Sequence, residues 1–315
     1  MIAVTLTPLY SGIRPDSGPP FRSRVDALCV VLSIMSRAPA RVLALRAVFT
    51  TVGSVAPGIA ARWAETIFCT PPRNEPRLGE EEFLASGRRF DVVAEGQRLA
   101  AWEWGAGPTV ILVHGWGSRA GRFGALATAL VEAGFRVVAF DAPAHGRSTG
   151  RFASLPEFAR ALRAVADAAG PVFGVVGHSL GGAATTLALR DGLGAERIVL
   201  LAAPADVTQF STQFADHLRL PTGARTVMRR NLEARLQIRW DELHLPTIAR
   251  RLSAPALLVH DRADTDVPFA DGEQIASAWP RARIVATDGL GHRGLLRDAS
   301  VVREVVAFLR EPSER

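Results

Sequence analysis

The sequence has no lysine, one tyrosine (Tyr10) and only two cysteines, Cys29 and Cys69. Two cysteines cannot build the disulfide framework of a small secreted protein, and no C-x-x-C or Cys/His spacing of a structural zinc site occurs. The first residues, MIAVTLTPLYSGIRPD, also lack the basic start, apolar core and cleavage site of a secretory signal. We therefore expect no metal, and a reducing, cytoplasmic location.

A long apolar run and the phosphate-binding motif G-K-[ST] are missing as well. The longest window free of charged residues and histidine, residues 47–61, is 15 residues long and contains Pro57, whereas a membrane-spanning helix needs about 20 apolar residues. The run GHSLGG lacks the G-x-G-x-x-G spacing, and no G-K-[ST] occurs, so we expect no cofactor. The net charge of +6 comes from arginines that are spread along the chain. Because they form no basic stripe with aromatic residues, we expect no nucleic-acid partner.

Hydrophobic residues make up 48% of the 315 residues, which is enough to form a large core. Residues 1–85 read as an N-terminal helical extension and linker: residues 1–20 are rich in glycine, proline and serine, residues 25–68 show helical spacing of apolar residues, and residues 70–82 are a proline-rich connector. We expect these helices to pack on the body of the protein, since apolar helical stripes are usually core. Peripheral contact with a membrane through residues 25–68 is the disfavoured alternative.

Residues 86–315 alternate between short apolar runs and helical patterns. Two strand-like runs, RFDVVA and RLAAWEW, come first, and the fully apolar TVILV (109–113) has the composition of a buried parallel strand. The alternation then continues to the end of the chain except at about 204–253, which is helical and arginine-rich. This predicts an α/β fold with a mostly parallel sheet, helices on both faces, and a helical cap insertion over the edge where ligands bind.

A candidate nucleophile lies in the run VFGVVGHSLGGAA (172–184). GHSLG fits G-x-S-x-G between a strand-like and a helix-like segment, and there the pattern places a serine on a sharp turn with its hydroxyl exposed. The alternative is a glycine turn that only packs strand against helix. Ser179 needs a base and an orienting carboxylate. His292, in a glycine-rich loop after the last strand, is the candidate base; His178, the neighbour of Ser179, should point away from the hydroxyl.

The candidate acids are Asp261, Asp264 and Asp266, in the loop of LLVHDRADTDVPF. With this element, the sequence from about Arg88 onward resembles the α/β-hydrolase family. The family's H-G-x-x-D-x-x-V-P element places the catalytic aspartate on Asp264, with Asp261 in place of a glycine. The resemblance also implies that HGWGS (114–118) is the oxyanion loop, with an oxyanion hole formed by the backbone N–H groups of Trp116 and Leu180. FDAPAHGRS matches a further family loop, with Ala144 replacing its first glycine.

These residues predict a serine hydrolase that cleaves a small ester, thioester or amide through an acyl-enzyme intermediate. The same groups serve an acyltransferase or a carbon–carbon hydrolase, and a non-catalytic ligand-binding protein is a further alternative. Dehalogenases and epoxide hydrolases of this family carry aspartate where Ser179 stands. We expect a small acyl substrate beneath an apolar cap face, with mild tolerance for anionic leaving groups near the mouth of the site. Most of the cap arginines are expected on a solvated face. The oligomeric state is left open. Phe210, Phe214, Leu218 and Trp240 are the residues expected on that apolar face.

Overall fold

A computed structural model describes residues 39–312, so the expectations for residues 1–20 and for the first part of 25–68 lie outside the described chain. The strands are β1 (Arg88–Ala94), β2 (Gln97–Trp104), β3 (Thr109–Val113), β4 (Arg136–Phe140), β5 (Val172–His178), β6 (Arg197–Leu201), β7 (Ala256–Asp261) and β8 (Ala282–Thr287). They form one 8-stranded sheet in the order β1-β2-β4-β3-β5-β6-β7-β8. β2 pairs antiparallel with both of its neighbours, and every other pairing is parallel. The predicted fold class is confirmed.

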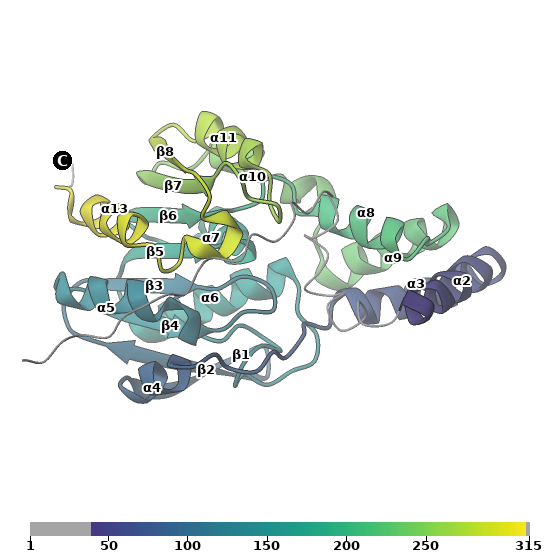
Figure 1. Cartoon of the computed structure of the whole chain (residues 1–315), viewed down its shortest axis with the longest axis horizontal. Coiled ribbons are helices and arrows are strands. Elements are labelled where there is room, and N and C mark those ends of the chain that lie inside the picture. Colours follow the sequence, from purple (N-terminus) through teal and green to yellow (C-terminus); the bar gives the residue numbers. More distant parts are fainter. Residues whose placement is uncertain (1–38, 313–315) are drawn as a thin grey trace, which may run out of the picture.

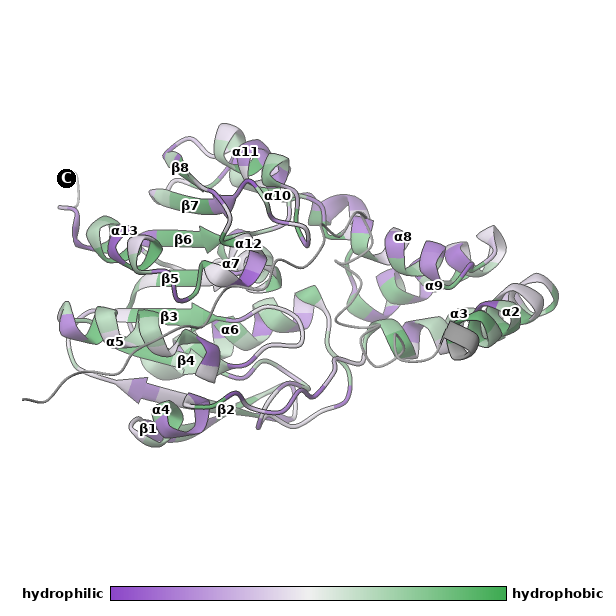
Figure 2. Cartoon of the chain, in the orientation of Figure 1, coloured by the Kyte–Doolittle hydropathy of each residue, from purple (hydrophilic) through white to green (hydrophobic). Residues whose placement is uncertain are grey.

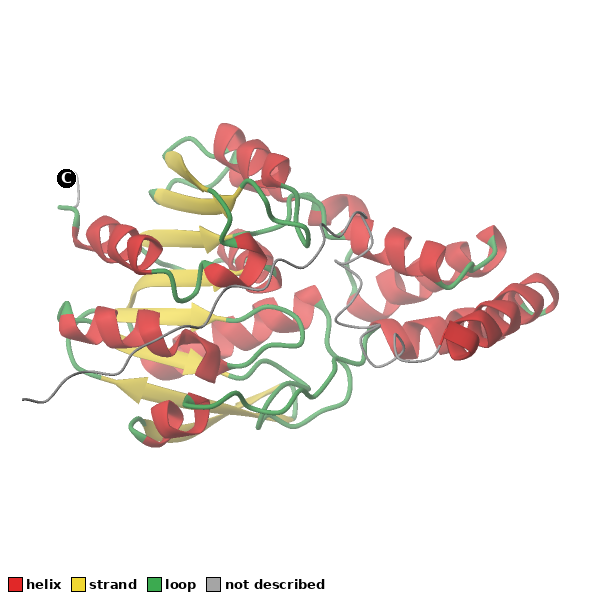
Figure 3. Ribbon diagram, in the orientation of Figure 1, coloured by secondary structure: helices red, strands yellow, loops and turns green. Residues whose placement is uncertain are grey.

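The helices surround this sheet and extend beyond one of its edges (Figure 3). They are α2 (Pro39–Val55), α3 (Pro57–Phe68), α4 (Glu80–Ala85), α5 (Gly124–Glu132), α6 (Leu155–Ala169), α7 (Leu180–Arg190), α8 (Thr208–His217), α9 (Thr222–Leu236), α10 (Leu245–Ala249), α11 (Phe269–Ala278), α12 (Gly291–Gly294) and α13 (Ala299–Arg310), with the 3₁₀ helices η2 (Ala120–Phe123) and η3 (Trp240–Leu243). The short helices α4 and α12 lie in segments where the sequence indicated a linker and a loop.

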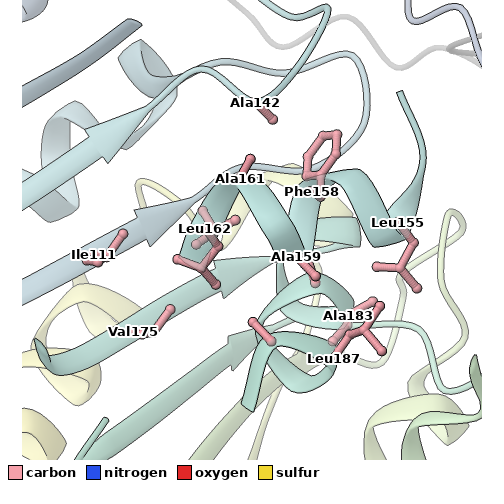
Figure 4. Packing of buried hydrophobic residues seen from close by; sticks show 14 of the residues in the cluster. Ile111, Ala142, Leu155, Phe158, Ala159, Ala161, Leu162, Val175, Ala183 and Leu187 are labelled. Atoms are coloured by element: carbon pink, nitrogen blue, oxygen red, sulfur yellow. The ribbon is translucent and has the colours of Figure 1, made fainter. Parts of the chain in front are cut away.

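Two apolar layers cover the sheet, because alternate strand residues point to opposite faces. Ile111 and Val175 pack with Phe158 and Leu162 of α6 and Leu187 of α7 on one face, as Figure 4 shows. Their chain neighbours face the other side, where α5 and α13 pack. The parallel strands end toward α8 and α9 (Figure 1), so this two-layer core fixes the edge of the sheet at which the loops after β3, β5, β7 and β8 meet.

The cap is the segment that leaves the sheet after β6. Asp206 pairs with His244 as an isolated antiparallel bridge, and the N–H of Leu245 donates to the carbonyl of Ala205 at 2.9 Å. These contacts bring the two ends of the segment together, so α8, α9 and η3 project from a narrow base. α10 packs back on α7 and α11 in the body.

The described N-terminal helices pack on the cap rather than on the sheet, which corrects our expectation that they lie on the body. α3 lies along α9, and α2 contacts both α3 and α9. The helices share one apolar cluster, formed by Phe49, Ala60, Ala61, Ala64, Cys69, Phe214, Ala215, Leu218, Leu220, Ala224, Met228 and Leu232. The alanines of α3 let the helices approach closely. Without α2 and α3, the apolar back of the cap would face water.

Polar contacts join the same elements. Arg46 of α2 donates through Nε to the carbonyl of His217 at 2.7 Å, and Asn231 of α9 donates to Glu65 of α3 at 2.7 Å. The outer side of these helices keeps some exposed apolar side chains, including Leu43, Val55 and Trp63, within the partly hydrophobic helices of Figure 2. No described helix combines the length and the hydropathy needed to cross a lipid bilayer.

Substitutions on two sides of α3 test this packing. Ala64 is fully buried against the cap, whereas Thr66 is exposed on the same helix. Ala64→Leu should lower the free energy of unfolding by about 1–3 kcal/mol, because a larger side chain must be forced into a filled interface. The matched control, Thr66→Leu, should change it by less than about 0.5 kcal/mol. Equal midpoints of the two variants in denaturant unfolding would contradict the α3–α9 interface.

Candidate active site

Ser179 occupies the turn between β5 and α7 in a backbone conformation that serine rarely adopts. Its φ of 54° and ψ of −123° lie outside the regions favoured by residues with a side chain. Such a conformation costs on the order of 1–3 kcal/mol and persists only where the surroundings impose it. Here the N–H of Ser179 donates to the carbonyl of Leu201 at the end of β6, at 2.8 Å. The turn therefore holds the serine at the carboxyl edge of the sheet.

Glycines make this turn sterically possible. A Cβ at Gly177 would lie 2.6 Å from the Gly181 carbonyl oxygen, and a Cβ at Gly181 would lie 2.1 Å from the Val113 oxygen. A Cβ at Gly115 would lie 2.9 Å from the Cβ of Ser179. The chain thus needs glycine at three positions so that β5, α7 and the loop after β3 can converge on one serine. These contacts fit the interpretation of GHSLG as a functional turn.

His292 and Asp264 come together from two loops at the same edge. The Nδ1 of His292 lies 2.8 Å from Oδ2 of Asp264. The other carboxylate oxygen of Asp264 accepts the N–H groups of Asp266 and Val267, at 2.8 and 2.9 Å. These bonds fix the carboxylate so that one oxygen is directed to the imidazole. His292 lies in α12, a single helical turn, where the sequence predicted a loop.

The charge of Asp264 is favoured by its surroundings. Burial raises the pKa of the carboxyl, but the rings of His260 and His292 and the N–H of Val267 outweigh it and hold the pKa well below its ordinary value. His260 is buried and donates through Nε2 to the carbonyl of Val267 at 3.0 Å. Asp264 therefore stays ionised throughout the physiological pH range, and it can stabilise a positive charge on His292.

The two other aspartates of this loop have different contacts. Asp261 is fully buried and its Oδ2 accepts from the Thr287 hydroxyl at 2.7 Å and the Leu290 N–H at 3.0 Å. Asp261 thereby ties down the loop that leads to His292. The Oδ2 of Asp266 lies 3.4 Å from Nη2 of Arg293. Of the three candidates, the structure brings only Asp264 to the histidine.

His178 has a contact that the sequence did not indicate. The Nε2 of its ring donates to the backbone carbonyl of His292 at 2.9 Å, and His178 lines the same cavity as Ser179. The two imidazoles are tilted against each other at 4.8 Å between ring centroids. Burial, followed by the neighbouring His292, lowers the pKa of His178 to about 3, so it remains neutral. His178 supports the position of His292.

Ser179 and His292 line the same cavity, but no hydrogen bond joins the serine hydroxyl to the His292 ring within residues 39–312. This contact often tightens only when a substrate is bound. The amides of Trp116 and Leu180 donate to no residue of the described chain, so both N–H groups are available to a ligand. Both residues line the cavity as well.

Two buried histidines fix the loop that carries Trp116. His114 donates through Nδ1 to the Gly115 carbonyl at 2.7 Å and accepts the Ala142 N–H through Nε2 at 2.9 Å. His145 accepts the Gly117 N–H at 3.0 Å through Nε2. Burial lowers the pKa of both imidazoles, and each accepts a hydrogen bond that only the neutral ring can accept. These two histidines hold the loops after β3 and β4 in a fixed position relative to each other.

The loop after β4 contains a strained residue at the position where the resemblance expected glycine. Ala144 has a φ of 63°, which is in the left-handed region. Its N–H donates to the carbonyl of Thr149 at 3.0 Å, which closes the loop around it. Ala144 is buried in the core cluster, so its methyl group contributes packing that a glycine would lack. The replacement therefore keeps the loop shape at some cost in strain.

The cavity has a volume of about 680 Å³ and lies between the sheet edge and the cap. Its cap side is mostly apolar and includes Phe68, Val207, Phe210, Phe214, Leu232, Leu236, Trp240 and Leu243. Three of the four predicted apolar cap residues are among them. Leu218 is not: it is buried in the cluster between the cap and the N-terminal helices. Phe68 was missed, because its helix was assigned to the body.

The described chain offers no alternative site for a metal ion, since no group of three or more His, Cys, Asp or Glu residues between 39 and 312 could hold one. The convergent polar groups of this edge are instead a serine, an imidazole, a carboxylate and free amides. Groups of this kind, beside an apolar cavity, suit chemistry on a carbonyl carbon.

Comparison with known proteins agrees with this architecture. Residues 106–242 match the family described as serine aminopeptidase, S33, and residues 240–315 match the family described as TAP-like protein. The structure resembles an esterase from Pyrococcus furiosus with 21% identity, a TM-score of 0.59, and coverage of 76% of this chain and 96% of that chain.

Two further solved structures are similar. For a putative lipase from Acinetobacter baumannii the identity is 18% and the TM-score 0.57, with 76% of this chain and 98% of that chain covered. For a bromoperoxidase from Bacillus anthracis the identity is 18% and the TM-score 0.56, with 71% and 100% covered. At these identities the likeness concerns the fold. Together with the two family matches, which extend from residue 106 to the C-terminus, it shows that the chain has the α/β-hydrolase fold.

Proposed function

We propose that the protein is a serine hydrolase that cleaves a small ester, thioester or amide, with Ser179 as nucleophile, His292 as base and Asp264 as the orienting acid. The observation that carries the proposal is the convergence of Ser179 and His292 on one cavity, with His292 hydrogen-bonded to an ionised Asp264. The solved esterase and lipase of the same fold add support at the level of reaction class.

The reaction would proceed in two steps. His292 takes the proton of the Ser179 hydroxyl as its oxygen attacks the carbonyl carbon, and the negative charge that develops on the carbonyl oxygen meets the N–H groups of Trp116 and Leu180. His292 then returns the proton to the leaving alcohol, thiol or amine. Water attacks the acyl-enzyme by the same route. Asp264 stabilises the charged imidazole in both steps.

The cap side of the cavity supports an acyl group as the apolar part of the substrate. Phe210, Phe214 and Trp240 provide apolar surface there, and a charged group would be costly against it. The finite volume of the cavity, about 680 Å³, limits the length of the chain that it can enclose. We therefore propose short to medium acyl chains.

The nucleophile assignment is tested by Ser179→Ala. The variant should lose labelling by a fluorophosphonate probe and should retain only the residual rate that binding and oxyanion stabilisation provide. Gel fluorescence of the labelled protein is the measurement. As a control, Ser211→Ala, another serine of the cavity lining, should label like the unmodified protein. Undiminished labelling of the Ser179 variant would refute the assignment.

The three aspartates should rank in a defined order. Asp264→Asn should lower kcat/KM on the order of 10⁴-fold, because the amide favours the wrong imidazole tautomer. Asp261→Asn should have a smaller effect, through the loop that it holds to Thr287 and Leu290. Asp266→Asn should have the smallest effect of the three. Rates with circular dichroism as a folding control would show the order, and a larger loss at Asp261 or Asp266 would assign the acid to that residue.

The acyl length that the cavity accepts is measured with a series of neutral p-nitrophenyl esters. We expect kcat/KM to reach its maximum at a short or medium chain and to fall for long chains, because the cap closes the apolar side. Phe214→Ala should shift the maximum to a longer chain by enlarging that side. A steady rise to long-chain lipid esters in the unmodified protein would contradict the proposed substrate class.

A further inference from the structure

The part of the cavity lining that comes from outside the cap is cationic. Four arginines line it, and the whole lining contains a single acidic residue, Asp266. We call the set Arg77, Arg122, Arg293 and Arg297 the cationic end. Arg77 belongs to the connector between α3 and α4, Arg122 to η2, and the other two to the segment from α12 to α13. Three segments that are distant in sequence therefore place positive charge at one end of the cavity that Ser179 lines.

The local carboxylates do not balance these charges. Asp266 lies 3.4 Å from Arg293, and buried Glu80 lies 2.8 Å from Arg122 and 3.7 Å from Arg119. One carboxylate, Glu80, thus serves two guanidinium groups. No ion pair within the described residues involves Arg77 or Arg297. The cationic end therefore keeps an excess of positive charge at a place where a ligand can reach it.

The arginines also act on one another. Burial lowers the pKa of the Arg122 guanidinium, and the charges of Arg77, Arg119 and Arg293 lower it further, against the opposite effect of Glu80. Like charges held together in this way repel each other. A bound anion would relieve that repulsion and would accept hydrogen bonds from guanidinium groups, which suit carboxylate and phosphate oxygens.

The connector is held in place, so Arg77 is part of the site. The side chain of Asn74 donates to the carbonyl of Gly117 at 3.0 Å, and Arg73 donates to the carbonyl of Gly150 at 3.1 Å. Both contacts attach the connector to the loops after β3 and β4, next to Trp116. Its prolines restrict the backbone further.

We propose that the cationic end binds a carboxylate or phosphate on the leaving part of the substrate, while the acyl part lies on the apolar cap side. This proposal rests on the serine hydrolase function proposed above and specifies its substrate class: acyl esters or thioesters of an anionic alcohol or thiol. The apolar side excludes the opposite orientation, because a charge there would lack a partner.

The cap arginines do not supply this site. None of the eight arginines between residues 204 and 253 lines the cavity. Several are engaged within the cap itself: Arg225 with Asp216, Arg229 with Glu233, and Arg239 with Asp241. The positive charge that lines the cavity is carried by arginines outside the cap.

Direct binding tests the proposal without turnover. The protein is the full chain with Ser179→Ala, and the probes are the hexanoyl esters of 4-hydroxybenzoate and of 4-hydroxybenzamide, which have the same size and differ in charge. Calorimetric titration at low salt should give at least about tenfold tighter binding of the anionic ester. The preference should shrink as salt is added, since the arginines are partly exposed. The hexanoyl ester of 4-hydroxyphenyl phosphate shows whether phosphate is preferred to carboxylate.

The arginines are tested in the same background by Arg77→Gln combined with Arg297→Gln. Both side chains are exposed, so these changes leave no buried carboxylate unpaired, as Arg122→Gln would leave Glu80. The preference for the anionic ester should fall about tenfold. Arg230→Gln, an exposed arginine of α9 outside the cavity lining, should leave the preference unchanged.

The outcomes separate the two proposals. Equal affinity for the anionic and neutral esters, or a preference that survives the double substitution, would overturn the cationic end. Turnover of the neutral ester by the unmodified protein reports on the hydrolase function alone. If that turnover is absent but Ser179→Ala protein binds the anionic ester through Arg77 and Arg297, the serine hydrolase function fails and the anion site stands.

Discussion

The site depends on one backbone constraint: the chain must turn sharply at Ser179 while two other segments pass within contact distance of it. Glycines at 115, 177 and 181 provide the space, and the hydrogen bond to Leu201 anchors the turn to β6. The packing of the sheet stabilises this strained turn, because β5 and β6 are buried between two helical layers. The position of the serine is therefore a property of the whole sheet rather than of the five residues GHSLG.

The positions of the other polar groups follow from that same edge. Asp261 fixes the loop that carries His292, and His178, which precedes the serine, donates to the backbone of His292 from the other side. His114 and His145 hold the loop of Trp116. Buried polar side chains thus support both His292 and the loop of Trp116. Supporting groups of this kind restrict the motion of catalytic side chains.

The sequence predicted the fold and brought attention to the correct edge of the sheet, because strand and helix periodicities and the G-x-S-x-G turn are local signals. The pairing of Asp264 with His292 could be anticipated from the resemblance, although Asp261 and Asp266 competed for the same position. The contacts of His178, the partner of α3 and the cationic end could not be anticipated. They arise between segments that are distant in the sequence, and the arginines that form the cationic end look no different in the sequence from those on solvated faces.

The packing of α2 and α3 on the cap has a consequence for biosynthesis. Arg46 contacts a residue 171 positions later, and the contact of Glu65 with Asn231 spans 166 positions. At translation rates of about 5–20 residues per second, such a separation takes on the order of 10–30 s to synthesise. During that interval the apolar sides of α2 and α3 have left the ribosome before α8 and α9 exist to cover them. The nascent chain therefore exposes the apolar residues of α2 and α3 to water until the cap segment has been synthesised.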